Sequence, residues 1–378
     1  MAAVATTMLY TGCINDDLED GDPQKIRFTT KVAGVQSATL GGANTRTIYD
    51  DGTFKHFTVT AFDKDKSKAY FENLEANYQA DNSWKTQVDY YWPQYSLNFY
   101  GYAPSTLKDH VIITADVHEI KDYTVKNNVK EQDDVLASFN NANSGTEKGT
   151  VPLYFQHAMH QVEIYAKNGS PIDPNSTDDA KQYQVEVLGV KICQVPSTAT
   201  LTFQNHPDSL PKWSEPTGLT DYMIKSDTGA VVLGNELTKL NFGTDGFLMM
   251  PQQLKAWSGS KENNEGAYVS VLCRIKDKDG HKIYPKNSDE FAFVAIPVSD
   301  NWEVGKKHYI NLMFFTNGGG AGIVPPDLHN PDLPDDPDVD TNPGMEEGDR
   351  VIPEASTPMV VSEKIAPWEQ GKNTDLYL

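Results

Sequence analysis

The stretch Ile26-Arg27-Phe28-Thr29-Thr30-Lys31-Val32 alternates apolar and polar side chains, with the apolar ones at even positions. Because successive side chains of a β-strand point to opposite faces, this alternation predicts a strand with one buried and one wet face. The same pattern recurs at 55–63, 85–92, 95–103, 151–167, 182–193, 266–276, 290–298 and 307–315. Convincing amphipathic helices are absent from the sequence, which therefore predicts an all-β chain built of antiparallel β-sandwiches.

Composition bounds the size and the chemistry of the chain. Its 378 residues include 38% hydrophobic residues, 18 Tyr and 15 Phe, which is enough to bury two domain cores. The formal net charge of -21 repels nucleic-acid phosphates, so nucleic acid is excluded as a partner. Three cysteines, Cys13, Cys193 and Cys273, lie too far apart in sequence to form a disulfide framework or a zinc motif.

The N-terminal residues predict export. Residues 1–12, MAAVATTMLYTG, carry no charged side chain and end at Cys13, as the remnant of a signal peptide would. Thr11 and Gly12 suit a lipidation motif, whereas Tyr10 stands where Leu is usual. We therefore expect a lipid on Cys13, which would anchor the precursor to the outer membrane. The alternative is an ordinary buried or free cysteine, followed by a solvated acidic tether.

Composition shifts along the chain divide it into segments. The Asn/Gly-rich stretch 140–150 predicts a linker, which separates a first sandwich domain, 13–148, from a second, 149–316. Residues 317–350 hold nine acids, six prolines and one Arg or Lys, which predicts an extended, self-repelling linker. Residues 351–378 regain apolar side chains, so this C-terminal extension is expected to pack on its own domain or on a neighbour.

Several local patterns together resemble the fimbrillin family, the subunits of type V pili in Bacteroidetes. They are TRTIYDDGTFKHFTVTAF from Thr45, YYWP from Tyr90, LNFYGYAP from Leu97, QDDVLAS from Gln132, VPLYFQHAMHQV from Val151, MPQ from Met250 and WEVGKKHY from Trp302. The acidic run that follows Cys13 is similar to the signal that exports Bacteroidetes lipoproteins to the cell surface. The resemblance implies two transthyretin-like β-sandwich domains and a structural subunit of a surface fimbrium. A pilus tip or anchor subunit is the alternative.

The resemblance also implies an assembly mechanism. In the family, an arginine-specific, trypsin-like protease removes an N-terminal strand, and the C-terminal strand of another pilus subunit fills the groove. Here the cut falls between Arg46 and Thr47, and the strand that leaves is 26–32. Arg27 is the competing site, but a strand would protect its backbone. The donor is 351–378.

The donor segment has its own alternation. Met359, Val361 and Ile365 fall on one face of the expected strand, with Glu363 as an interruption.

Two other patterns in the sequence resemble ligand sites. His157 and His160 form H-x-x-H, but on a strand they point to opposite faces, so we expect no metal there and a core position for His157. Asp336, Asp338 and Asp340 imitate a calcium loop, yet no Gly stands at its turn, and a solvated acidic linker is the simpler interpretation.

A group of aromatic side chains could instead stack on sugars. A host or glycan receptor is therefore a possible partner, and the alternative function is that of a surface glycan-binding lipoprotein. Aromatics at strand spacing more often form a core. The set is Trp84, Tyr90, Tyr91, Trp92, Tyr95, Phe99, Tyr100 and Tyr102. No nucleophile or phosphate-binding motif occurs, so we predict neither an enzyme nor a bound cofactor.

Overall fold

The computed structural model describes residues 24–33, 49–50, 52–63, 68–173, 182–326 and 336–367. In this part of the chain nearly all regular structure is β-strand, which confirms the all-β prediction. Among the described residues, helical structure is confined to short 3₁₀ segments: η2 (Ser105–Asp109), η3 (Val129–Glu131) and η4 (Thr146–Gly149). None of the described residues forms a helix long and apolar enough to cross a membrane.

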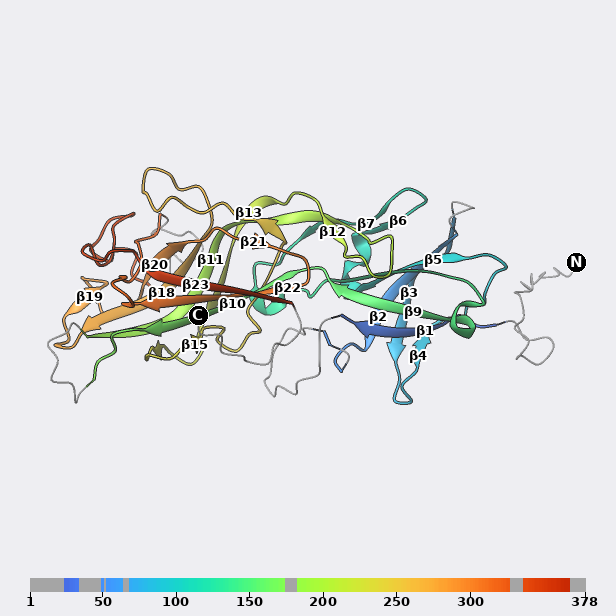
Figure 1. Ribbon diagram of the computed structural model, residues 1–378, viewed down its shortest axis with the longest axis horizontal. Coiled ribbons are helices and arrows are strands. Elements are labelled where there is room, and N and C mark those ends of the chain that lie inside the picture. The colour runs from blue at the N-terminus through green and yellow to red at the C-terminus, as the bar shows by residue number, and fades with distance from the viewer. Residues whose placement is uncertain are drawn as a thin grey trace, which may run out of the picture.

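The first sheet has seven strands and forms one end of an elongated molecule (Figure 1). Their order across the sheet is β1 (Arg27–Val32), β9 (Thr150–His157), β8 (Leu136–Ala142), β5 (Leu97–Ala103), β2 (His56–Asp63), β3 (Lys68–Tyr78) and β4 (Trp84–Thr86). Neighbours are antiparallel except for β1, which runs parallel to β9 at the edge. One face of the sheet covers a core rich in phenylalanine, which includes Phe57, Phe99 and Phe155.

The second part of the molecule contains a nine-stranded sheet. Its main path is β19 (Lys282–Tyr284), β18 (Tyr268–Asp277), β11 (Tyr183–Thr202), β7 (His118–Thr124) and β6 (Val111–Ile113). Three further strands pair with β11, namely β12 (Lys212–Trp213), β13 (Thr217–Lys225) and β14 (Val231–Val232), and β20 (Ala292–Pro297) pairs with β18.

A five-stranded sheet accompanies it. This sheet contains β15 (Thr238–Lys239), β10 (His160–Asn168), β22 (Lys306–Phe314) and β23 (Val360–Pro367) in order, with β16 (Phe247–Met249) also on β10. β10 and β22 are parallel, and β22 and β23 are antiparallel. A separate ribbon joins β17 (Gln252–Gln253) to β21 (Asn301–Trp302).

The two parts do not separate at residue 148, contrary to the predicted boundary. β9 lies after that point but belongs to the first sheet, whereas β6 and β7 lie before it and extend the second. Tyr102 and Phe139 of the first sheet also join the hydrophobic core of the second part. The stretch 140–150 connects β8 to β9. Gly149 has a φ of +81° and lies against Gln24, so this glycine serves a tight turn.

The described parts of 317–350 are packed, so the prediction of an extended linker is wrong for them. Ala321 and Val324 are buried in the core of the second part. Ile323 exchanges two main-chain hydrogen bonds with Ala295, at N···O distances of 2.6 and 3.0 Å. The apolar residues of this segment thus anchor it despite its charge.

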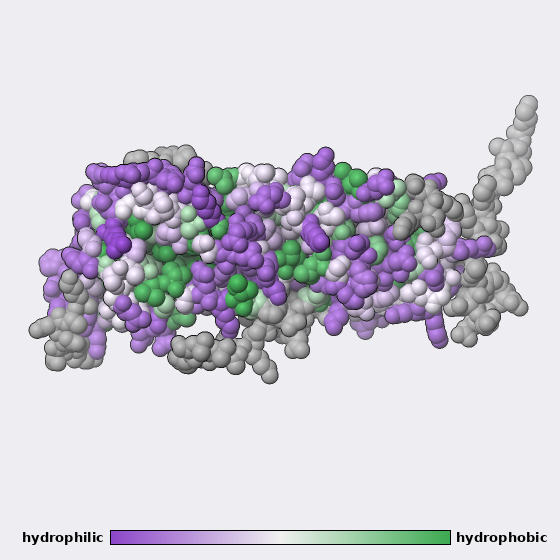
Figure 2. Space-filling model, turned by 45° about the horizontal axis from the view of Figure 1, so that its top comes forward, coloured by the Kyte–Doolittle hydropathy of each residue, from purple (hydrophilic) through white to green (hydrophobic). Residues whose placement is uncertain are grey.

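The acids of the segment have partners of their own. Lys225 Nζ lies 2.6 Å from a carboxylate oxygen of Asp336 and 3.0 Å from one of Asp338. Ser288 donates a hydrogen bond to Asp340. Protein cations and hydroxyls therefore bind the carboxylates that imitated a calcium loop. Elsewhere the surface is mainly hydrophilic, and Figure 2 shows apolar side chains gathered in separate patches on one face.

Candidate functional site

The N-terminal strand β1 and the residue before it bury the even-numbered apolar side chains, as the alternation predicts. Ile26, Phe28 and Val32 are each at most 6% exposed. The ring of Phe28 packs edge-on against Phe57 and Phe99, with ring centroids 5.7 and 6.0 Å away. Removal of β1 would therefore uncover a trough lined by aromatic core side chains.

Among the described residues, β1 pairs as a strand with β9 alone. Along β9 it keeps a parallel register from Arg27 opposite Thr150 to Val32 opposite Phe155. On the other side, Ile26 N donates to the carbonyl oxygen of Tyr90 at 2.8 Å, just before β1 begins. Further along, a hollow of about 250 Å³ adjoins Phe28 and Thr30 and reaches β4. An edge strand with so few lateral partners is the type of element that can be exchanged.

The C-terminal strand β23 lies on the edge of its own sheet. It pairs with β22 from Val360 opposite Met313 to Pro367 opposite Lys306. Met359, just before the strand, is buried, and Val361 packs partly against the same core, but Ile365 is 48% exposed. In this position Met359 and Val361 contact the core, and main-chain pairing with β22 holds the described residues that follow, as far as Pro367.

Three residues singled out from the sequence lie outside the described residues. They are Cys13, the expected lipid attachment site, and Arg46 and Thr47, which flank the expected cut. Arg46 belongs to the connection between β1, which ends at Val32, and β2, which begins at His56.

The structure places His157 and His160 on different strands. His157 ends β9, is buried as predicted, and its Nδ1 lies 2.9 Å from a carboxylate oxygen of Asp134. His160 begins β10 and meets two residues far away in sequence, Asp300 and His308. One ligand atom of each of these three residues lies within 4.8 Å of the others.

Electrostatics within this histidine cluster, defined as His160, Asp300 and His308, follow from burial. Burial lowers the pKa of His160 to about 4, although its hydrogen bond to the carbonyl of Glu303 works in the opposite direction. Burial also acts to raise the pKa of Asp300, but the contact with His308 outweighs it and holds that pKa below its usual value. Glu363 of β23 lies beside the cluster, and burial raises its pKa.

The aromatic set does not form an exposed platform. Trp92, Phe99, Tyr100 and Tyr102 are buried. The indole N–H of Trp92 donates to the carbonyl of Gly149 at 2.9 Å, which fixes the ring inside the first part of the molecule. Half of the eight aromatic residues are therefore core, and Trp84, Tyr90 and Tyr95 pack against it partly buried.

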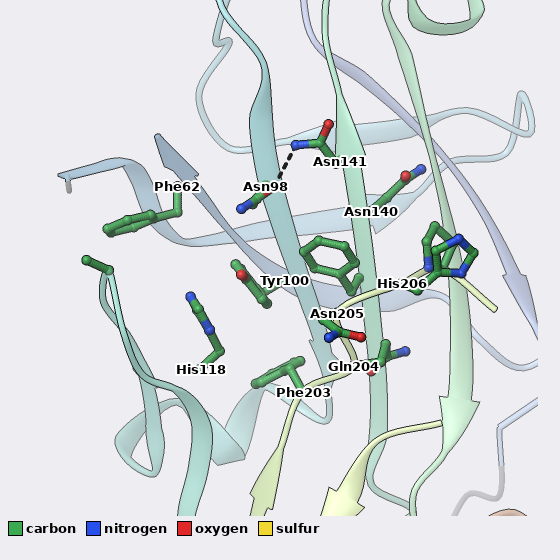
Figure 3. A pocket seen from close by; sticks show the side chains of 13 residues that line it. Phe62, Asn98, Tyr100, His118, Asn140, Asn141, Phe203, Gln204, Asn205 and His206 are labelled. Atoms are coloured by element: carbon green, nitrogen blue, oxygen red, sulfur yellow. Dashed lines mark hydrogen bonds between the residues drawn. The ribbon is translucent and has the colours of Figure 1, made fainter. Parts of the chain in front are cut away.

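A polar hollow of about 640 Å³ lies where the first sheet meets β7 and β11 (Figure 3). Tyr100 and His118 stack in its wall with ring centroids 4.5 Å apart, and Phe203 meets Tyr100 edge-on at 5.7 Å. Amides supply most of the polar lining, among them Asn98, which accepts a hydrogen bond from Asn141 at 2.6 Å. Among the described lining residues there are aromatic rings and amides but no carboxylate, which suits an uncharged polar ligand better than an ion.

A comparison with protein-family models identifies a fimbrillin-like family over residues 45–322. The chain belongs to this fimbrillin-like family. Membership supports a role as a structural subunit of a fimbria at the cell surface, in assembly with other subunits, and it supports a protein without enzymatic activity. A search of curated proteins gives no match.

Two solved structures are similar to this fimbrillin-like chain to different degrees. A fimbrial protein from Bacteroides vulgatus is 14% identical, with a TM-score of 0.52, and the alignment covers 91% of this chain and 99% of that one. A protein from Bacteroides ovatus, proposed to act in cell adhesion, is 12% identical with a TM-score of 0.47 and coverages of 93% and 100%. The first likeness supports the β-sandwich architecture, and the transthyretin-like layout of two domains stays a prediction.

We expect acid to destabilise this fimbrillin-like chain through His160. The unfolded chain takes up a proton at His160 below about pH 6.5, whereas the folded chain resists until about pH 4. The contribution of His160 to the free energy of unfolding is therefore complete above pH 6.5. It is lost as the pH falls, by about 2 kcal/mol between pH 7 and 5. Urea unfolding of wild type and His160→Gln at both pH values measures this loss. Equal losses in the two proteins would contradict it.

Sequence reasoning missed Asp300 and His308 as partners of His160. The three residues come from separate segments, and only the parallel pairing of β10 with β22 brings His160 and His308 together. A strand pattern gives the face on which each histidine lies but not the neighbouring strand. Each histidine is a polar residue on a strand face that is otherwise apolar, and this feature of the sequence could have pointed to the cluster.

Proposed function

We propose that this chain is a stalk subunit of a surface fimbria, assembled by exchange of β1 for the C-terminal strand of the next subunit. One observation carries the proposal: both segments have the same side-chain pattern. The N-terminal segment presents Ile26, just before β1, then Phe28 and Val32 within it, with Thr30 between the last two. The C-terminal segment presents Met359, Val361 and Ile365 at the same spacing, with Glu363 in the place of Thr30.

The matching pattern bears on the energy of exchange. Full burial of one aliphatic side chain stabilises by ~1.5 to 3 kcal/mol, before the cost of ordering the chain. On its own domain the segment leaves Ile365 largely exposed. In the slot of β1 the same residue would take the place of Val32, which is 1% exposed. The slot therefore offers this strand more buried apolar surface than its own sheet does.

Cleavage at Arg46 is the proposed trigger. Before the cut, β1 is part of the same chain and occupies the slot at a high effective concentration. After the cut it can leave, and a donor strand can enter. Treatment of the purified chain with an arginine-specific protease should yield polymers visible by electron microscopy. Complete cleavage with only monomers left would contradict strand exchange.

Lipidation at Cys13 is the proposed route to the surface. Cys13→Ala should release the precursor from the outer membrane or leave it inside the cell, because the acyl chains that hold it would be missing. Metabolic labelling with palmitate and fractionation of the membranes measure both effects. Cys193→Ala is the control, since that cysteine is buried. Equal labelling of Cys13→Ala and wild type would refute the assignment.

A further inference from the structure

We propose that the histidine cluster of His160, Asp300 and His308 binds a divalent transition-metal ion of the zinc type. His160 begins β10, His308 lies on the neighbouring strand β22, and Asp300 directly precedes β21. Their ligand atoms lie within 4.8 Å of one another, so small side-chain movements would bring them around one ion. Both histidines are fully buried, so their orientation is fixed by packing.

His160 has the hydrogen-bonding pattern of a metal ligand. Its Nδ1 lies 2.9 Å from the carbonyl oxygen of Glu303, which can only accept, so Nδ1 carries the proton. The lone pair is therefore on Nε2, which is buried and has no hydrogen-bond partner among the residues that the structure describes. A ligating histidine typically donates its other N–H to a carbonyl or carboxylate in this way. Trp302 stacks on the ring, 5.6 Å away and inclined by 10°, and holds its orientation.

The other two residues complete the set of donor atoms. Nδ1 of His308 contacts the carboxylate of Asp300, and its Nε2 lies 3.9 Å from a carboxylate oxygen of Glu363. An ion bound by His160 Nε2, His308 Nδ1 and Asp300 would leave Glu363 to orient His308 from outside. Two imidazoles and one carboxylate favour Zn²⁺, Co²⁺ or Ni²⁺ over Ca²⁺ or Mg²⁺, which prefer oxygen ligands.

A second group of ligand-type residues does not share these properties. Asp277, Asp279 and His281 lie in an exposed turn. The Asp277 carboxylate already accepts main-chain hydrogen bonds from residues 279 and 281, at 2.9 and 2.8 Å, and contacts His281 Nδ1 at 2.9 Å. It is an ordinary turn. His281→Gln therefore provides a background without weak surface binding.

A metal ion in this site would also help to hold β23 in its own sheet. The importance of this effect for assembly rests on the proposed function, in which β23 is the donor strand. Glu363 belongs to β23 and lies opposite Ile310 of β22, close to the cluster. Because Glu363 orients His308 only while β23 is in place, metal binding and retention of β23 favour each other. Metal should therefore slow the release of this strand as a donor.

Metal binding is tested on the full chain carrying His281→Gln. Zn²⁺ titration by calorimetry should give one equivalent at micromolar or tighter affinity, and Co²⁺ should give the visible absorption of a site with nitrogen ligands. His160→Gln should weaken the affinity at least 100-fold, and Glu363→Gln about 10-fold. Thermal unfolding in a chelator checks that each variant is folded. Absence of binding, or unchanged affinity in the folded variant His160→Gln/His308→Gln, would overturn the site.

The effect on assembly is measured separately, on the protease-treated chain with and without Zn²⁺. Slower polymerisation with Zn²⁺ in wild type, but not in His160→Gln, supports the coupling. Equal rates with bound Zn²⁺ would refute the coupling and leave the metal site intact. Failure of the treated chain to polymerise under either condition refutes strand exchange, whatever the calorimetry shows.

Discussion

A chain that ends at Met359 is expected to fold and to fail in polymerisation. This truncation keeps Val351 and Met359, which are buried in the core, and removes β23. Since β23 lies on a sheet edge with Ile365 exposed, its loss should lower the melting temperature by no more than ~10 °C. Loss of the donor strand should abolish growth of the polymer completely.

Two measurements separate this expectation from the alternative that residues 360–378 complete their own domain. Thermal unfolding of the truncated chain shows whether residues 360–378 complete their own domain, and a loss of cooperative unfolding would show that they do. Mixing the truncated chain with full-length chain after protease treatment should shorten the polymers, because the truncated chain accepts a donor but offers none. Normal polymer from the truncated chain alone would refute the donor assignment.

Arg46→Ala is expected to leave the chain monomeric under conditions in which wild type polymerises. Without the cut, β1 stays tethered, and the buried side chains of Ile26, Phe28 and Val32 keep the slot filled. Because exchange would then have to displace a covalently linked strand, we expect the rate of polymer formation to fall by at least ~100-fold. Size-exclusion chromatography after protease treatment measures the fraction of polymer.

Arg27→Ala is the matched control. Arg27 is exposed, but it lies within β1, where its backbone pairs with β9. A protease should not be able to bind this paired backbone in its active site. This variant should polymerise as wild type does. A monomeric Arg27→Ala together with a polymerising Arg46→Ala would place the cut at Arg27 instead.

The sequence predicts the strands of this chain better than their partners. Alternation in 26–32 correctly gives the buried face of β1, because side-chain direction along a strand is a local property. The parallel pairing of β1 with β9 depends on residues more than a hundred positions away, and no local pattern encodes it. The same limit applies to the histidine cluster, whose members come from three separate segments.

The segment 317–350 shows a second limit. Its prolines and acids are typical of an extended linker, since like charges repel in an isolated chain. In the folded protein Lys225, 111 residues from Asp336, neutralises part of that charge, and Ile323 pairs with Ala295. The composition of a segment predicts how that segment would behave alone in water. It does not include the Lys225 side chain or the apolar surface that the rest of the chain supplies.

The length of β11 has a mechanical consequence for a fibre. This strand has 20 residues and runs along the nine-stranded sheet, from its pairing with β18 near one end to its pairing with β7 near the other (Figure 1). At roughly 3.3 Å per residue it extends about 65 Å. Tension applied along the second part of a subunit would thus pass along a continuous strand held by hydrogen bonds on both sides, not through a flexible joint. Such a subunit would transmit shear as a stiff rod, and the exchanged strands between subunits would be the first connections to yield.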